Sequence, residues 1–286
     1  MPFVSVHHKI NAVTHYGTHQ YHHRFLFSGK GFRGPLQTEA SLSEIFHENT
    51  KLTPISSRAY GAWIGQIARS RLLTSLMAQA FKTYTLMDQV VLPPASPQRE
   101  LEDLIANRRS TRHYAGTSAS QEELARLLYF SYGITDTRRN FRAVASGGGL
   151  YPLEIYAVAL KVEDLEQGIY HYNIEQNCLD TISRGDRLAE IKESIWFEDI
   201  EIDDAALLFI VTAVFERSTL KYQDRGYRMI LMEAGEVAQN MTLEANALGL
   251  GVCLVGGFHD NNLSKILEID GSYEAPLLPI VVGRIA

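Results

Sequence analysis

The longest helical pattern in the sequence lies between Ser218 and Leu248. Apolar residues recur there at intervals of three and four, which places them on one face of an α-helix. They are Tyr227, Ile230, Leu231, Ala234, Ala238, Met241, Ala245 and Leu248. We expect one long helix packed on a core and opened by the pair Lys221 and Tyr222. Gly235 in its middle costs about 1 kcal/mol relative to alanine, which indicates that another backbone or a flat ligand approaches closely there.

Short apolar runs before and after this helix predict β-strands. Residues 153–160 alternate, and residues 206–214 form a continuous apolar run typical of a strand buried on both faces. Further strands are predicted at 168–172 and 178–182, which form a hairpin, and at 251–255 and 278–282. We therefore predict an α+β fold, a mixed β-sheet flanked by helices.

Other segments have helical patterns. Residues 58–87 predict a helix broken once, and residues 99–107 and 261–267 predict short helices. Ser120 and Glu123 form a capping box that starts another helix, and Gly133 ends it.

The first part of the chain has a different character. Seven of the ten histidines lie in the first fifty residues, at positions 7, 8, 15, 19, 22, 23 and 47, without a sustained period. Because no Cys, Asp or Glu lies among His15, His19 and His22 to complete a site, we do not expect a bound metal. Prolines at 93, 94 and 97 mark a boundary. We predict an N-terminal arm with a helical extension over 1–92, which makes dimer or partner contacts, and a compact domain over 93–286.

Composition excludes several classes of protein. The net charge of −6 argues against a nucleic-acid binder, which needs a basic face. The longest apolar run, 205–215, is too short to cross a membrane, and the first ten residues lack a signal-peptide pattern. Two distant cysteines, Cys178 and Cys253, suit a reducing compartment better than a disulfide framework. We expect a cytoplasmic protein without nucleic-acid or membrane partners.

Candidate binding chemistry lies in a basic cluster and in glycines. Arg108, Arg109 and Arg112 are three guanidinium groups within five residues, which attract an anion. The run 147–149 is three consecutive glycines, whose backbone N–H groups are accessible to a ligand. Residues 249–256 contain glycines that follow a helix and precede a strand, which is the wrong order for a dinucleotide-binding fingerprint.

Taken together, these segments resemble the nitroreductase superfamily, within it the SagB-type and cyanobactin-oxidase-like azoline dehydrogenases. The resemblance spans about 107–284. It is carried by RRSTR at 108–112, SGGGLYPLEIY at 146–156, GIYHYN at 168–173, KY at 221–222 and GYRMILMEAGEVAQN at 226–240. Each motif alone is weak, but the combination is specific.

The resemblance implies an FMN cofactor and assigns residues to it. Cofactor-binding positions would be Arg108, Arg109, Ser110, Arg112, Ser146, Gly147, Gly148, Gly149, Gly256 and Arg284. The loop departs from the usual family pattern at Ala145, where proline is common, and at Gly149, where alanine is common. Lys221 and Tyr222 resemble the catalytic pair of the microcin-type azole-forming enzymes. Lysine and tyrosine ordinarily titrate near pH 10, so a base near neutrality needs desolvation or a neighbouring charge.

The function implied is oxidation of thiazoline or oxazoline rings in a ribosomally synthesised peptide to thiazoles or oxazoles, with oxygen as electron acceptor. The implied partners are an azoline-containing precursor peptide, a second copy of the chain in a homodimer whose flavin sites lie at the subunit interface, and cyclodehydratase subunits. Two alternatives stay open at this point. One is an NAD(P)H-dependent nitro- or quinone-reductase, and the other is a flavin-binding scaffold of a peptide-modifying complex.

Overall fold

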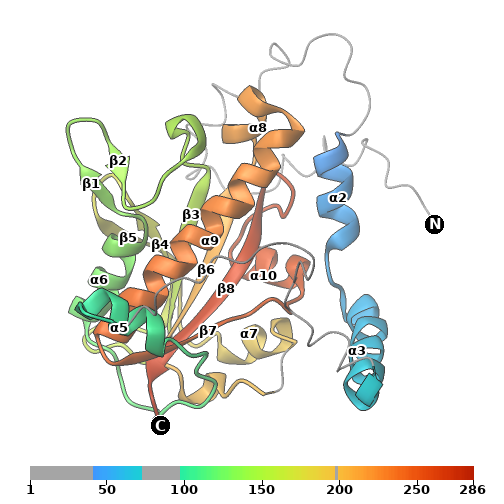
Figure 1. Cartoon of the computed structure of the whole chain (residues 1–286), viewed down its shortest axis with the longest axis horizontal. Helices are drawn as coiled ribbons and strands as arrows, with labels where there is room; N and C mark the ends of the chain where they lie inside the picture. Colours follow the sequence, from blue (N-terminus) through green and yellow to red (C-terminus); the bar gives the residue numbers. More distant parts are fainter. Residues whose placement is uncertain (1–40, 73–96, 197–198) are drawn as a thin grey trace, which may run out of the picture.

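The computed structural model describes residues 41–72, 97–196 and 199–286 of the chain (Figure 1). Its centre is a six-stranded sheet in the order β5-β4-β3-β6-β8-β7. The strands are β3 (Leu153–Ala159), β4 (Gly168–Asn173), β5 (Cys178–Arg184), β6 (Leu207–Val214), β7 (Leu250–Leu254) and β8 (Glu274–Arg284). All six were predicted, with shifted boundaries. Every residue of β6 is buried, as its continuous apolar run predicts.

The pairing of the strands corrects one part of the predicted fold. All neighbouring strands of the six-stranded sheet are antiparallel, so the sheet is not mixed. β6 and β7 run in the same direction because both are antiparallel to β8. They are not neighbours, since β8 lies between them. The α+β class is correct, and the antiparallel pairing follows from the insertion of the last strand.

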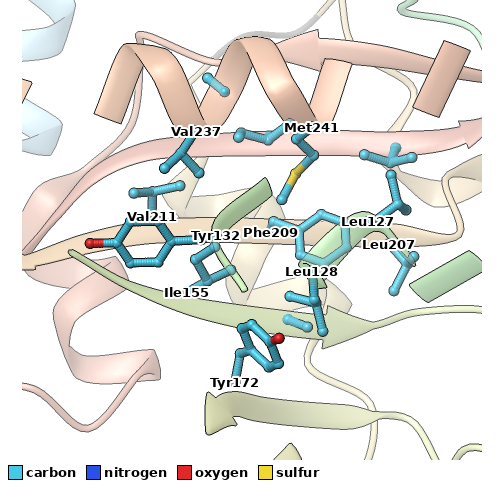
Figure 2. Close-up of a cluster of buried hydrophobic side chains, with 14 of the residues drawn as sticks. Leu127, Leu128, Tyr132, Ile155, Tyr172, Leu207, Phe209, Val211, Val237 and Met241 are labelled. Carbon is cyan, nitrogen blue, oxygen red and sulfur yellow. The ribbon is translucent and has the colours of Figure 1, made fainter. Parts of the chain in front are cut away.

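Helices cover both faces of the sheet. α6 (Gln121–Tyr132) and α9 (Asp224–Ala247) pack on one face, and α7 (Leu188–Ser194) and α10 (Asp260–Ile266) contribute to the core on the other. Ser120 and Glu123 form the predicted capping box of α6, and Gly133 follows its last turn. Figure 2 shows the hydrophobic core on the α6 and α9 face of the sheet, where Tyr132, Phe209 and Met241 lie between the helices and the strands. α5 (Glu100–Asn107) lies beside the C-terminal half of α9, as Figure 1 shows.

The long helix predicted from Ser218 is two helices. α8 (Glu216–Tyr222) ends before Gln223, whose φ of 50° and ψ of −143° interrupt the helical backbone, and α9 begins at Asp224. Lys221 and Tyr222 therefore close a short helix and do not open the long one. The turn is tight, because a Cβ at Gly226 would lie 2.9 Å from the carbonyl oxygen of Ser218.

The apolar face of α9 is buried except at its edges. The predicted residues Ile230, Ala238 and Met241 are fully enclosed, whereas Leu231 is 43% exposed. Gly235 has no atom of the described chain within 4 Å of a Cβ placed on it, so no neighbour within the described structure accounts for this glycine.

Two helices lie within residues 41–72. α3 (Pro54–Arg69) ends with Ser70 as its cap, and helical backbone resumes at Arg71, which agrees with the predicted break. The remainder of the predicted helix lies outside the described residues. α2 (Leu42–Thr50) was not predicted, although Ser41 and Glu44 form a capping box for it. Both helices expose apolar side chains, among them Leu42, Phe46, Ile55 and Trp63.

His47 is the histidine of the first fifty residues that falls within the described chain. It is buried in α2, and its Nδ1 lies 3.1 Å from the hydroxyl of Tyr227 on α9. His47 therefore packs α2 against α9 within one chain. The other six lie outside the described residues. The domain boundary at 92 also lies outside them and stays a prediction.

Some elements were missed by the pattern analysis. They are the hairpin of β1 (Ile134–Asp136) and β2 (Phe141–Arg142), the helix α7, and 3-10 turns at Gly147–Gly149 and Ile202–Asp204. Each is short, which leaves too few residues for a periodic pattern. Within the described residues, no helix has the length and apolar content needed to cross a membrane.

Candidate functional site

The glycine loop and the Lys221–Tyr222 pair lie in contact. A Cβ built on Gly148 would fall 2.5 Å from the Tyr222 hydroxyl and 2.8 Å from the Lys221 ammonium nitrogen. The Lys221 nitrogen also lies 5.1 Å from the centre of the Tyr222 ring. Gly148 has φ of 69°, a left-handed conformation that suits glycine, and a larger residue there would displace the ends of the Tyr222 and Lys221 side chains. Two segments about seventy residues apart thus form one site.

A network of hydroxyl groups around a buried carboxylate holds this loop on α9. Glu233 accepts hydrogen bonds from the hydroxyls of Ser146, at 2.6 Å, and Tyr132, at 2.7 Å. The Ser146 hydroxyl oxygen in turn accepts the N–H of Tyr151 at 2.9 Å. Burial raises the pKa of Glu233, and the hydrogen bonds from Ser146 and Tyr132 only partly offset it. The side chain of Ser146 therefore fastens the loop, which leaves backbone groups of the loop to face a ligand.

A second network fastens α8, the helix that carries the pair. Arg217 pairs with Glu154 of β3 and donates to the carbonyl of Tyr151 at 3.2 Å. His171 of β4 lies 2.9 Å from the other oxygen of Glu154. Asp180 lies 3.6 Å from the second ring nitrogen of His171. The start of α8, the sheet and the end of the glycine loop are therefore joined through one arginine.

The charges of this second network shift its pKa values in opposite directions. Burial acts to raise the pKa of Glu154, but the hydrogen bond from His171 and the charge of Arg217 outweigh it, so this pKa is lowered. Burial acts to lower the pKa of His171, but the hydrogen bond and charge of Glu154 raise it above its ordinary value. Both shifts favour the ionised pair.

The predicted anion site lies beside the edge strand β7. Ser110 forms a parallel bridge with Val252, and the N–H of Thr111 donates to the Val252 carbonyl at 2.8 Å. Within the described chain, the guanidinium groups of Arg108, Arg109 and Arg112 pair with no carboxylate. The guanidinium of Arg109 donates to the carbonyls of Ala106, at 3.2 Å, and Arg108, at 2.7 Å. Three cations without an acidic partner fit the binding of a phosphate.

The remaining two predicted cofactor residues, Gly256 and Arg284, differ in whether partners within the chain already surround them. Gly256 is exposed just beyond the end of β7 and has open space beside it. Arg284 donates to Glu123 at 2.6 Å and to the carbonyl of Leu248 at 3.2 Å, so its guanidinium already supports the start of α6. A role for either residue in cofactor binding stays a prediction.

Within one chain, the glycine loop and the basic cluster lie far apart. The glycine loop lies against Met229, near the start of α9, whereas the basic cluster follows α5 and contacts Gly251, just beyond the end of α9. Met229 and Ala247 are 18 residues apart, or about 27 Å at 1.5 Å per residue. Figure 1 shows α8 and α5 at opposite ends of α9.

These features define the class of protein to which the chain belongs. A family model described as the nitroreductase family matches residues 105–284, which includes both groups of site residues. The chain is a member of the nitroreductase family, as its motifs predicted. Members of this family bind FMN. Family membership makes the chain an oxidoreductase.

The chain is also similar to individual proteins of known name. MJ1384 of Methanocaldococcus jannaschii, assigned to the nitroreductases, is 39% identical over 67% of this chain and 94% of its own length. The microcin B17-processing protein McbC of Escherichia coli is 28% identical over 57% of this chain. The trifolitoxin-processing protein TfxB of Rhizobium leguminosarum is 30% identical over 55% of this chain. The chain spans 61% of the length of McbC and 45% of that of TfxB.

A solved structure shares the fold over most of the chain. A chain of the E. coli microcin synthetase McbBCD complex, solved with truncated pro-MccB17 bound, superposes with a TM-score of 0.61. The match covers 87% of this chain and 99% of that chain, at 22% identity. At this identity the similarity establishes the common fold.

Several residues of the site were missed by sequence reasoning. Glu154, Arg217 and Glu233 hold the loop and α8 in place, yet each is an ordinary polar residue in its own segment. Only Glu154 could have been noticed in the sequence, because it is the one charged residue in a strand that is otherwise buried. Within the described residues, no group of three or more His, Cys, Asp or Glu side chains could hold a metal ion.

Proposed function

We propose that the protein is an FMN-dependent dehydrogenase that oxidises thiazoline or oxazoline rings of a ribosomally synthesised peptide to thiazoles or oxazoles. The observation that carries the proposal is the contact of Lys221 and Tyr222 with Gly148. It places two groups able to exchange protons against the loop that the resemblance assigns to the flavin ring. Similarity to two peptide-processing proteins, McbC and TfxB, supports the peptide substrate.

The described residues fit a phosphorylated flavin. Arg108, Arg109 and Arg112 offer unpaired guanidinium groups for the phosphate. Gly148 and Gly149 have positive φ angles, which suits a loop whose backbone faces a flat ring. When bound, FMN would accept a hydride from the azoline ring and be reoxidised by oxygen. The basic cluster offers a site for a monophosphate, which favours FMN over FAD.

The chain's own part in the reaction is to hold the ring and remove a proton. In this proposal Lys221 or Tyr222 accepts the ring proton as the hydride leaves, and aromatisation drives the reaction. The Tyr222 ring is half-buried and the Lys221 ammonium is exposed, so both can meet a peptide that arrives from solvent. Arg217 keeps α8 against the loop through Glu154 and the Tyr151 carbonyl.

The proposal includes a homodimer with shared flavin sites. Because the basic cluster and the glycine loop lie at opposite ends of α9, one flavin would contact the cluster of one subunit and the loop of its partner. Exposed apolar side chains on α2 and α3 offer surface for such an association. The open space beside Gly235 on the exposed side of α9 is compatible with close approach of the second copy. Cyclodehydratase subunits are proposed as further partners, by analogy with the McbBCD complex.

A reductase that uses NAD(P)H is the second candidate. Its support is the match to MJ1384, which covers more of this chain than the match to McbC does. Such an enzyme would need FMN but not the Lys221–Tyr222 pair, because hydride comes from nicotinamide and no substrate proton is removed. Variants of Lys221 and Tyr222 therefore distinguish the two candidate functions.

Variants of the pair test the proposal. Lys221→Ala and Tyr222→Phe should lose azoline oxidation by about 10²- to 10⁴-fold, the usual contribution of a positioned base, with FMN content and melting temperature unchanged. Lys265→Ala, at an exposed position of α10, controls for removal of a surface lysine and should retain full activity. Rate, flavin content and melting curve are measured on the same preparations. If both pair variants stay fully active on an azoline peptide, neither residue is the required base and the proposed mechanism is wrong.

A further inference from the structure

A cavity of about 610 Å³ lies between the β1–β2 hairpin and the turn that joins β4 to β5. Its lining includes Arg142 of β2, Asn140 of the hairpin turn, Tyr151 beyond the glycine loop, and Asn177. Glu175 is the acidic residue among the described residues that line it, and its side chain is exposed to solvent. The proposed oxidation assigns no role to this cavity.

Arg142 gives the cavity its chemical character. Its guanidinium carbon lies 4.5 Å from the centre of the Tyr132 ring and 4.7 Å from that of Tyr151, so two aromatic faces fix its position. Its Nη1 is buried and has no hydrogen-bond partner. The charge of Arg142 acts on the carboxylate of Glu233, whose oxygens accept the hydroxyls of Tyr132 and Ser146, but no hydrogen bond joins Nη1 to it. A buried charged donor without a partner is costly, and a carboxylate beside the guanidinium would offset part of that cost.

The cavity adjoins the proposed reaction site. Tyr151 contributes its ring to the cavity, while its carbonyl accepts the hydrogen bond from Arg217 of α8. Gly149, between Tyr151 and the Gly148 contact with the reactive pair, has no atom within 4 Å of a Cβ placed on it. The Cβ direction of Gly149 is therefore open, on the segment that links the cavity to the pair.

The hairpin beside the cavity carries more positive charge. Arg138 and Arg139 are exposed in its turn, and Asp136 accepts both of their backbone N–H groups. The Arg139 guanidinium lies 5.7 Å from the centre of the Phe141 ring and only 3.7 Å from Asp136. Arg138 has no ion pair within the described chain. These charges favour the approach of an acidic segment.

We propose that this cavity binds a carboxylate side chain of the peptide substrate and so selects substrates with an acidic residue near the ring to be oxidised. The inference rests on the proposed function, because it takes the ligand to be the peptide. Arg142 would bind the carboxylate through guanidinium N–H groups at the cavity wall, and the amide of Asn177 would lie at the same ligand.

Binding of two matched probes tests this inference without any oxidation. The probes are rhodamine-labelled hexapeptide amides, Gly-Asp-Leu-Asp-Leu-Gly and its neutral counterpart Gly-Asn-Leu-Asn-Leu-Gly, followed by fluorescence anisotropy with flavin-loaded protein. The acidic probe should bind at least ten-fold more tightly than the neutral one, and Arg142→Gln should abolish the difference. Equal binding of the two probes by the unaltered protein would overturn the proposal.

Asn177→Asp gives a second test that does not depend on Arg142. Asn177 has φ of 50°, which Asp tolerates, and its side-chain oxygen accepts the Tyr172 hydroxyl at 2.6 Å, which a carboxylate also can. The added charge should weaken binding of the acidic probe several-fold and leave the neutral probe unchanged. Gln176→Glu adds the same charge at an exposed neighbour that does not line the cavity, and it should have little effect.

The outcomes separate this inference from the proposed function. If the acidic probe binds but no azoline is oxidised, the oxidation proposal fails and the carboxylate site stands. If azolines are oxidised but Asn177→Asp and Gln176→Glu affect the acidic probe equally, the carboxylate site is wrong and the oxidation proposal stands.

Discussion

Replacement of Gly148 by alanine should disable the site without unfolding the protein. The added Cβ would lie 2.5 Å from the Tyr222 hydroxyl and 2.8 Å from the Lys221 nitrogen. The hydroxyl must move by about 0.9 Å to reach an ordinary contact of 3.4 Å. Both contacts are with the ends of flexible side chains, so the pair gives way and the backbone stays in place.

Two effects of this substitution have different magnitudes. Alanine at φ of 69° costs about 1–2 kcal/mol of folding free energy, because the left-handed region crowds a Cβ. That cost should lower the melting temperature by only a few degrees for a domain of this size. A misplacement of about 1 Å in a reacting group can cost about 10²-fold in rate. We therefore expect a modest loss of stability and a large loss of azoline oxidation.

Gly149→Ala is the matched control for backbone strain. Gly149 has nearly the same φ, 67°, but no atom lies within 4 Å of its added Cβ. Melting temperature and rate per bound flavin should be measured for both variants. They should melt at similar temperatures, and Gly148→Ala should be much the slower. If the rate per bound flavin falls equally in both variants, the contact of residue 148 with Lys221 and Tyr222 does not explain the loss, and the prediction is wrong.

Three further results are expected. Arg112→Ala should weaken flavin retention by about 1.5–3 kcal/mol, the usual contribution of a charge-assisted hydrogen bond, as measured by flavin release on dilution; unchanged retention would remove Arg112 from the site. Glu154→Gln should lower the melting temperature and the rate together, because Arg217 and His171 lose their charged partner; loss of neither would show that this network does not hold α8. His171→Gln should destabilise the protein most below pH 6.5, because protonated His171 makes the stronger pair with Glu154. The destabilisation should shrink as the pH rises through the raised pKa of His171. Melting curves of both proteins from pH 6 to 9 test this, and a constant difference in melting temperature would contradict it.

Periodic patterns predicted most of the fold because its principal elements bury one or both faces. The eight residues of β6 and the capping box at Ser120 needed no tertiary information. The antiparallel pairing could not be predicted in this way, since β8 reaches its place between β6 and β7 only through contacts distant in sequence. The break at Gln223 was missed because nothing in the apolar pattern marks it, and glutamine rarely adopts a positive φ.

For a similar reason, some residues of the site could be predicted from the sequence and others could not. Glycines and clustered arginines are conspicuous in sequence, and the contact of Gly148 with Lys221 and Tyr222 joins two of the predicted motifs. Glu233 and Glu154 act through partners from other elements, so their roles require the fold. The same holds for Arg142, whose environment is set by Tyr132 and Tyr151.

The most direct test of the account is the mass of an azoline-containing peptide before and after incubation with the flavin-loaded protein in air. The account predicts a loss of two hydrogens for each ring oxidised, with no nicotinamide cofactor present and with loss of the reaction in Tyr222→Phe. A peptide of unchanged mass, together with NAD(P)H-dependent reduction of a nitroaromatic compound that Tyr222→Phe retains, would contradict it and identify the protein as a reductase.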